Sequence, residues 1–238
     1  MKLIRKHLEK LKLVKRKKYH PLIHKIHKKH NISKKTLFYV KEYGPNTNVP
    51  RTIIKESIKI LILASLISSF GGLAFEHIKL LLVSLTPLII LFPALNDMVG
   101  DFGTIISSKF SSMLHEGKLN SKDLFKNKDI RRLFIQIFII AIFFGVLSSS
   151  LSFIFSSFSD HYSSLSTTVK IEIAFKVLII TLIDIMILIP LIFSLSIYAG
   201  LYFYRRGEDP NNFLIPITTS FADFGNMIIL YLLIILFF

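Results

Sequence analysis

Five long apolar stretches constrain the fold of this 238-residue chain more than any other feature. A helix needs about 20 mostly apolar residues to cross a bilayer, and each stretch is long enough to do so. They cover roughly residues 52–74, 78–99, 132–157, 171–203 and 213–237. The sequence therefore predicts an all-α membrane protein with five transmembrane helices per protomer.

The composition agrees with a membrane protein and excludes several kinds of site. Hydrophobic residues make up 52% of the chain, and its mean hydropathy is +0.56. The chain has no cysteine, so disulfides, thiolate metal sites and cysteine nucleophiles are excluded. Asp97 and Asp101 are paired acids, but they lack the flanking sequence of an aspartyl enzyme. We expect a protein that is not an enzyme and has no cofactor.

Basic residues predict the orientation of the spans, because Lys and Arg concentrate in cytoplasmic loops. Residues 1–50 contain 15 of the 30 Lys and Arg, and the 109–132 loop is also basic. The loops on the other side, 74–78 and 158–170, carry almost none. We expect a multi-pass protein of the cell membrane with its N-terminus in the cytoplasm and its C-terminus outside.

The basic N-terminal segment, residues 1–50, precedes a transmembrane domain at 51–238. We expect the segment to lie on anionic lipid head groups, which attract Lys and Arg. An alternative is a small nucleic-acid-binding element, since "HPLIHKIHKKHNISKKTLFYVKEYG" has a helix, turn, helix outline. That outline is short, and we expect it to lack a hydrophobic core of its own. The histidines from His20 to His30 also suit pH sensing or metal binding.

Four aspartates lie in or beside the spans, where an ionised carboxylate facing lipid costs at least ~2.5 kcal/mol. They are Asp97, Asp101, Asp184 and Asp223. Such acids should face the interior of a bundle or a water-filled path. Glycines on both sides of Asp101 permit a local break in the helix, with Asp97 capping the broken end. Asp184 suits either a neutral, hydrogen-bonded group or a functional one.

The fifth stretch places a hydroxyl group and a carboxylate on one helix face. It begins "EDPNNFLIPITTSFADFGN", in which Thr219 and Asp223 are four residues apart. Oxygen ligands without Cys or His suit a hard cation. Mg²⁺ fits best, because it keeps its waters and needs only one or two carboxylates. The residues alone also admit Ca²⁺, Mn²⁺, Na⁺ or protons.

Two motifs resemble those of MgtE-type magnesium transporters and their eukaryotic solute-carrier relatives. The second-helix signature of that family has a Pro, then Gly-Asn, then a Ser-Arg-Leu-Ser-like stretch and a glycine. The matching positions here are Pro93, Gly100-Asp101, Ser108-Lys109-Phe110-Ser111 and Gly117. The fifth-helix positions are Asp209-Pro210, Asn212, Pro216, Thr219-Ser220 and Asp223. The resemblance covers about residues 50–238.

The resemblance implies a five-helix protomer that forms a homodimer, with an ion path on the two-fold axis between the second and fifth helices. On that basis Asp223 attracts hydrated Mg²⁺, while Thr219 and Asn226 orient its waters. Asp101 stands where the family has Asn, which adds one negative charge per protomer. Asp97 is a further candidate metal-facing acid.

The resemblance thus predicts transport of a divalent cation down its electrochemical gradient, and the ligand chemistry favours Mg²⁺. The alternative is a membrane-tethered regulator whose basic segment binds nucleic acid. Unlike the transporter hypothesis, the regulator hypothesis predicts that the isolated segment binds duplex DNA with a steep salt dependence and that the spans conduct no ion.

Overall fold

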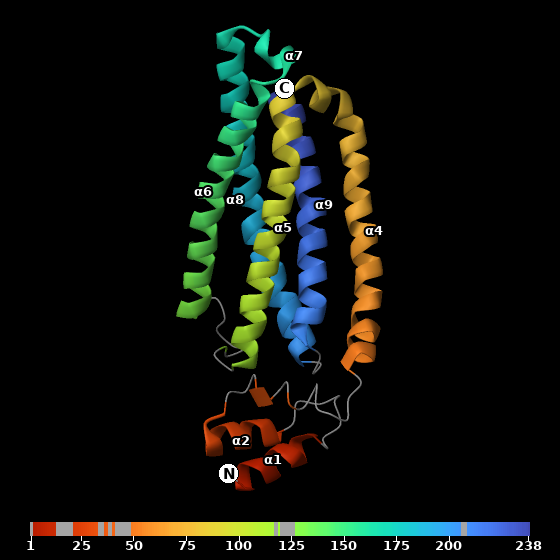
Figure 1. Ribbon diagram of the computed structural model, residues 1–238, viewed down its shortest axis with the longest axis vertical. Coiled ribbons are helices and arrows are strands. Elements are labelled where there is room, and N and C mark those ends of the chain that lie inside the picture. Colours follow the sequence, from red (N-terminus) through yellow and green to blue (C-terminus); the bar gives the residue numbers. More distant parts are fainter. Residues whose placement is uncertain are drawn as a thin grey trace.

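The protein forms a bundle of five long helices, with a pair of short helices at one end (Figure 1). The computed structural model describes residues 2–12, 21–32, 36–37, 40, 49–116, 119, 127–205 and 209–238. The long helices are α4 (Val49–Ser84), α5 (Thr86–His115), α6 (Lys128–Ser156), α8 (Thr167–Arg205) and α9 (Pro210–Phe237). The short ones are α1 (Lys2–Lys12), α2 (Pro21–His30) and α7 (Asp160–Ser163).

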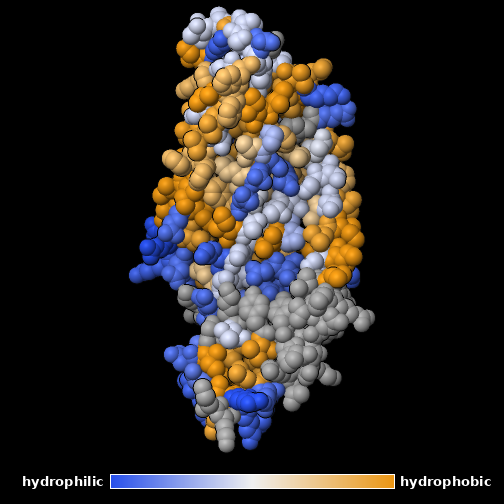
Figure 2. All heavy atoms as spheres, viewed as in Figure 1, coloured by the Kyte–Doolittle hydropathy of each residue, from blue (hydrophilic) through white to orange (hydrophobic). Residues whose placement is uncertain are grey.

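All five long helices are long and apolar enough to cross a membrane, which confirms the predicted fold class. The mean hydropathy of their most apolar parts ranges from 1.4 to 2.7. Large apolar side chains cover the outside of the bundle, where Figure 2 shows a broad hydrophobic band. Phe143, for example, is 63% exposed. Such a surface is stable in lipid, so the chain is a multi-pass membrane protein.

The first two spans meet at a different residue from the one expected. The predicted connection at 74–78 is helical, and α4 continues to Ser84 before the chain turns at Leu85. Pro87 lies in the first turn of α5, where a missing N–H costs nothing and the fixed φ favours a helix start. Pro87 therefore marks the boundary between the first two spans, which the apolar pattern alone does not locate.

The expected break of the second span beside Asp101 is also wrong. α5 runs without interruption from Thr86 to His115, through Pro93 and both glycines that flank Asp101. The glycines instead allow close packing. A Cβ at Gly103 would lie 3.4 Å from both the Cβ and the carbonyl oxygen of Thr218 on α9. The two helices are in close contact at this glycine, and Thr218 donates a hydrogen bond to the Gly103 carbonyl at 3.3 Å.

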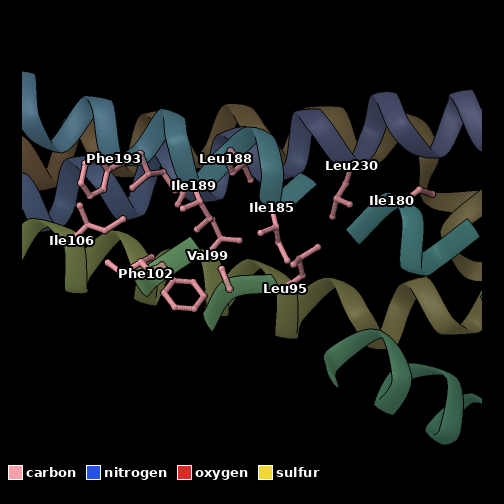
Figure 3. Close-up of a cluster of buried hydrophobic side chains, with 14 of the residues drawn as sticks. Leu95, Val99, Phe102, Ile106, Ile180, Ile185, Leu188, Ile189, Phe193 and Leu230 are labelled. Carbon is pink, nitrogen blue, oxygen red and sulfur yellow. The ribbon is translucent and has the colours of Figure 1, made fainter. Parts of the chain in front are cut away.

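The packed interior lies between α5, α8 and α9. Side chains from these three helices meet in Figure 3, including Leu95 and Val99 from α5, Ile185 from α8 and Leu230 from α9. In lipid, van der Waals packing of this kind is a main driving force for helix association. At the lower end of the bundle in Figure 1, the buried His115 ring of α5 lies 3.5 Å from Asp209, which caps α9.

Helix α4 lies at the edge of the bundle and packs mainly against α9 (Figure 1). Gly71 makes that contact possible, because a Cβ there would lie 2.6 Å from Met227 Sδ and 3.2 Å from the Phe224 Cα atom. Ser68, one turn earlier, therefore comes close to α9. The much smaller contact between α4 and α5 leaves the two helices apart.

The pair α1 and α2 has a hydrophobic core of its own, contrary to the expectation for the basic segment. Leu11, Ile23, Ile26 and Leu37 are buried together. Asn31 adopts a positive φ of 50° directly after α2, a backbone conformation that Asn tolerates at helix ends. The sequence did not predict this core, because its members are spread over α1, α2 and the later position Leu37. His20 lies outside the described residues.

Candidate cation site

A polar cavity of about 840 Å³ opens between α5 and α9, on the side of the bundle where α4 stands apart from α5. Four of the five predicted site residues line it: Asp97, Asp101, Thr219 and Asp223. The remaining lining comes from Phe92, Pro93, Ala94, Asn96, Gly100, Thr104 and Met227. The fold thus brings together the two motifs that lie more than 100 residues apart in the sequence.

Helical spacing explains why these side chains share one cavity. Asp97 and Asp101 are four residues apart on α5, and Thr219 and Asp223 are four apart on α9, so each pair lies on one face of its helix. The two faces are turned toward each other. Asp97 and Asp101 are exposed in the single protomer, whereas Thr219 and Asp223 are partly buried.

Hydrogen bonds from two other helices hold the Asp223 carboxylate. The side-chain amide of Asn96 on α5 donates to Asp223 Oδ1 at 2.8 Å. The Ser68 hydroxyl on α4 donates to Asp223 Oδ2 at 3.4 Å. Gly100 lies beneath the same oxygen, because a Cβ there would be 4.0 Å from Asp223 Oδ1. The carboxylate is thereby oriented toward the cavity by fixed donors before any ion arrives.

Asn226, the fifth predicted residue, lies behind the cavity wall. It is fully buried, and its side-chain amide donates to Asn96 Oδ1 at 2.9 Å. Asn226, Asn96 and Asp223 therefore form a hydrogen-bonded chain from the interior of the bundle to the cavity. Asn226 Oδ1 has no hydrogen-bond partner among the described residues. In this structure Asn226 is placed to orient Asn96.

Sequence reasoning missed Asn96 and Ser68. Asn96 immediately precedes Asp97 and is four residues before Gly100, so its helical spacing with that glycine would have placed it on the cavity face. Asn96 was not predicted because it is uncharged and the prediction was based on the acidic residues. Ser68 has no such signal, because it lies in an apolar stretch with no acid nearby. Its contribution depends on how closely α4 packs at Gly71.

A buried cluster of hydroxyl groups lies next to the cavity and joins α5, α8 and α9. Ser107 on α5 and Thr218 on α9 lie 2.9 Å apart, oxygen to oxygen, and Ser107 is also 3.4 Å from Ser196 on α8. All three side chains are fully buried. Polar bonds between helices in lipid have few competing partners, so this cluster fixes the distance between α5 and α9 one residue away from Thr219.

The charge of the cavity favours cations. Three carboxylates line it, and no Lys or Arg is among its described lining residues. Within the described parts of the chain, no three His, Cys, Asp or Glu side chains are close enough together to hold a metal ion directly. The arrangement therefore suits a cation that keeps part of its water shell. Six waters at about 30 Å³ each occupy about 180 Å³, so a hydrated ion fits.

Asp184 lies outside this cavity. It is fully buried on α8, and within the part of the chain that the structure describes neither of its carboxylate oxygens has a hydrogen-bond partner. The structure therefore separates Asp184 from the other three intramembrane acids.

Comparison with known protein families agrees with the geometry. The profile of the family described as MgtE, divalent cation transporter, matches residues 92–233, which is more than half of the chain. The match begins at Phe92, the first lining residue of the cavity, and covers most of both helices that form it. No curated protein and no solved structure matched the chain. The match shows that this chain belongs to the MgtE family of divalent cation transporters.

Proposed function

We propose that the protein transports Mg²⁺ across the membrane through the cavity between α5 and α9, down the electrochemical gradient. The observation that carries this proposal is the set of three carboxylates, two of them exposed, with no basic side chain among the described lining residues. Asp223 and Asp101 concentrate the cation, and the Thr219 hydroxyl and Asp97 contact its water shell. Membership in a transporter family agrees with a protein that is not an enzyme.

The preference for Mg²⁺ follows from the chemistry of its ligands. Mg²⁺ is dehydrated reluctantly and binds proteins through one or two carboxylates and several waters. A cavity of about 840 Å³ leaves room for those waters. Ca²⁺ favours six to eight oxygen ligands in direct contact, whereas no three acidic side chains among the described residues are close enough together to hold an ion directly. Mn²⁺ has similar ligand preferences and is the closest competitor.

A second copy of the chain would complete the path. The cavity opens sideways, and Asp97 and Asp101 are exposed on a surface at the depth of the apolar band. Figure 2 shows hydrophilic atoms at mid-height on this face of the bundle. Each ionised acid facing lipid would cost at least ~2.5 kcal/mol, and a two-fold related copy would remove both from lipid. We therefore propose a homodimer with the ion path on its axis.

The proposed orientation places the N-terminus in the cytoplasm. Lys109, Arg131 and Arg205 belong to the ends of α5, α6 and α8 that lie nearest the N-terminal helix pair. The N- and C-termini lie at opposite ends of the molecule (Figure 1). Positive loops stay on the cytoplasmic side, and the negative potential inside would then favour cation entry.

Ion uptake into proteoliposomes tests the proposal. Purified protein is reconstituted around a Mg²⁺-sensitive dye, and uptake is compared between wild type, Asp223→Asn, Asp101→Asn and the double variant. The control is Glu172→Gln, which removes an exposed acid of α8 that pairs with Lys176. We expect the double variant to lose at least ~90% of uptake and the control to keep it. Wild-type uptake by the double variant would refute the assignment.

The regulator hypothesis has one observation in its favour, the folded pair of basic helices α1 and α2. It requires the full-length protein to bind duplex DNA with a steep salt dependence and to conduct no ion. The same proteoliposomes, incubated with labelled DNA at 50 and 200 mM salt (about the range over which phosphate contacts weaken), distinguish the two functions.

A further inference from the structure

A second cavity, of about 390 Å³, lies at the start of α6, separate from the cation cavity. It is lined by Lys128, Arg131, Arg132, Ile135 and Gln136. The three basic residues are exposed and fall at positions i, i+3 and i+4, so they lie on one face of the helix. A concave surface with three cationic side chains fits an anion.

The charge of this cavity is only partly balanced nearby. Among the described residues, no ion pair involves Arg131 or Arg132. Asp129 is exposed and stands three residues before Arg132, a spacing that makes the two side chains neighbours on the helix, but no ion pair joins them in the structure. Two guanidinium groups remain available, each with a planar set of donors that matches two oxygens of a phosphate.

An apolar stripe continues from the basic face along α6. Ile135, Ile139 and Phe143 follow at intervals of four residues and are 44%, 61% and 63% exposed. Ile135 also lines the basic cavity, so the cavity and the stripe are continuous. Figure 2 shows hydrophilic atoms directly below the hydrophobic band at the lower end of α6, which Figure 1 locates. The change from charged to apolar surface is where a head group region meets the hydrocarbon core.

We propose that this cavity and stripe bind one anionic phospholipid. The phosphate of its head group accepts hydrogen bonds from Arg131 and Arg132, with Lys128 adding charge, and an acyl chain lies along Ile135, Ile139 and Phe143. Basic pockets at the ends of transmembrane helices suit such head groups, and a continuous apolar stripe distinguishes a lipid from a free phosphate ion. The site is independent of the cation path.

Native mass spectrometry of the full-length protein in detergent tests this site with phosphatidylglycerol as the probe. The variant Arg131→Gln/Arg132→Gln removes two charges from the cavity. The matched control Lys109→Gln/Arg205→Gln removes two exposed charges at the same end of the bundle but outside the cavity. We expect the first variant to bind phosphatidylglycerol about 30-fold more weakly and the control to bind it within about twofold of wild type.

Further arms identify the source of the phosphate and separate binding from folding. Phe143→Ser, at an exposed position, should weaken phosphatidylglycerol binding and leave the affinity for inorganic phosphate alone unchanged. Phosphatidylcholine should bind weakly to every variant. Equal loss in both double variants, or displacement of the lipid by equimolar inorganic phosphate, would overturn the proposal. The lipid-free melting temperature of the variants shows that they are folded, and Arg131→Lys/Arg132→Lys should restore part of the binding.

Discussion

Asn96 on α5 and Asp223 on α9 are joined by a 2.8 Å hydrogen bond in which the Asn96 amide donates to the carboxylate. The bond crosses the contact between the two helices that form the cation cavity. It fixes the direction of Asp223, the acid that the fifth-helix motif contributes to the cavity.

Replacing Asn96 with Leu should impair transport although all three carboxylates of the cavity remain. The Asp223 carboxylate loses its shortest hydrogen bond, which for a charged acceptor is worth about 1.5–3 kcal/mol. We expect the Mg²⁺ concentration for half-maximal uptake to rise about tenfold or more in the proteoliposome assay. Gln136→Leu removes an exposed amide of α6 and serves as the control. An unchanged concentration dependence would mean that Asp223 needs no fixed orientation.

Asn226 should act through Asn96. Among the described residues, its only side-chain hydrogen bond is the donation to Asn96 Oδ1 at 2.9 Å, and it does not line the cavity. Asn226→Leu should therefore weaken Mg²⁺ affinity by less than Asn96→Leu does. The double variant should be no worse than Asn96→Leu alone, since both changes break one chain. Additive losses in this double-mutant cycle would instead place Asn226 in direct contact with the ion's waters.

Asp101→Asn should lower the affinity for divalent cations and keep transport. The substitution removes one negative charge from an exposed position of the cavity and restores the residue of the family signature that the sequence resembles. We expect about tenfold weaker Mg²⁺ binding, measured by isothermal titration calorimetry of the detergent-solubilised protein. Mn²⁺ and Ca²⁺ should weaken in parallel, because charge alone has changed. A change in the order of ion affinities would contradict this purely electrostatic role.

Gly71→Ala and Gly72→Ala form a matched pair that tests the contact between α4 and α9. A Cβ at Gly71 would lie 2.6 Å from Met227 Sδ and 3.2 Å from the Phe224 backbone, whereas nothing lies within 4 Å of one at Gly72. Overpacking at Gly71 should cost about 1–3 kcal/mol, and Gly72→Ala should be neutral or slightly stabilising. Thermal unfolding in detergent measures both. Equal melting temperatures would show that α4 packs elsewhere.

The proposed homodimer predicts which introduced cysteines will cross-link. The chain has no native cysteine, so no background thiols need removal. Ala94→Cys lies at the open side of the cavity and should form a disulfide between two copies under mild oxidation. Ile139→Cys, exposed on α6, should remain monomeric on a non-reducing gel. Cross-linking at position 139 alone would place the interface on the other side of the bundle.

The spans and the acids of the site were predictable from the sequence because each leaves a strong local signal. About 20 apolar residues identify a crossing helix, and an aspartate within one is costly unless it serves a path. Thr219 and Asp223 were correctly expected to share a helix face, since their spacing of four residues decides that by geometry alone.

The features that the sequence did not predict depend on contacts between helices. Ser68 reaches Asp223 only because α4 lies close to α9 at Gly71, and nothing within residues 60–72 indicates that contact. The glycines around Asp101 were read as helix breakers, although tertiary packing uses them as contact points. The small core of α1 and α2 likewise joins residues from separate helices, so no single stretch predicts it.

Helix α4 runs without interruption through 36 residues, and eight residues separate its start from Val40, which packs against the core of α1 and α2. Its Ser68 hydroxyl touches Asp223, yet the helix is held to the bundle mainly through α9. A tilt of α4 away from α9 would separate the Ser68 hydroxyl from Asp223 and leave the Asn96 amide as the remaining described side-chain donor to that carboxylate. The end of the molecule that carries α1 and α2 is thus connected by one continuous helix to a residue that contacts Asp223.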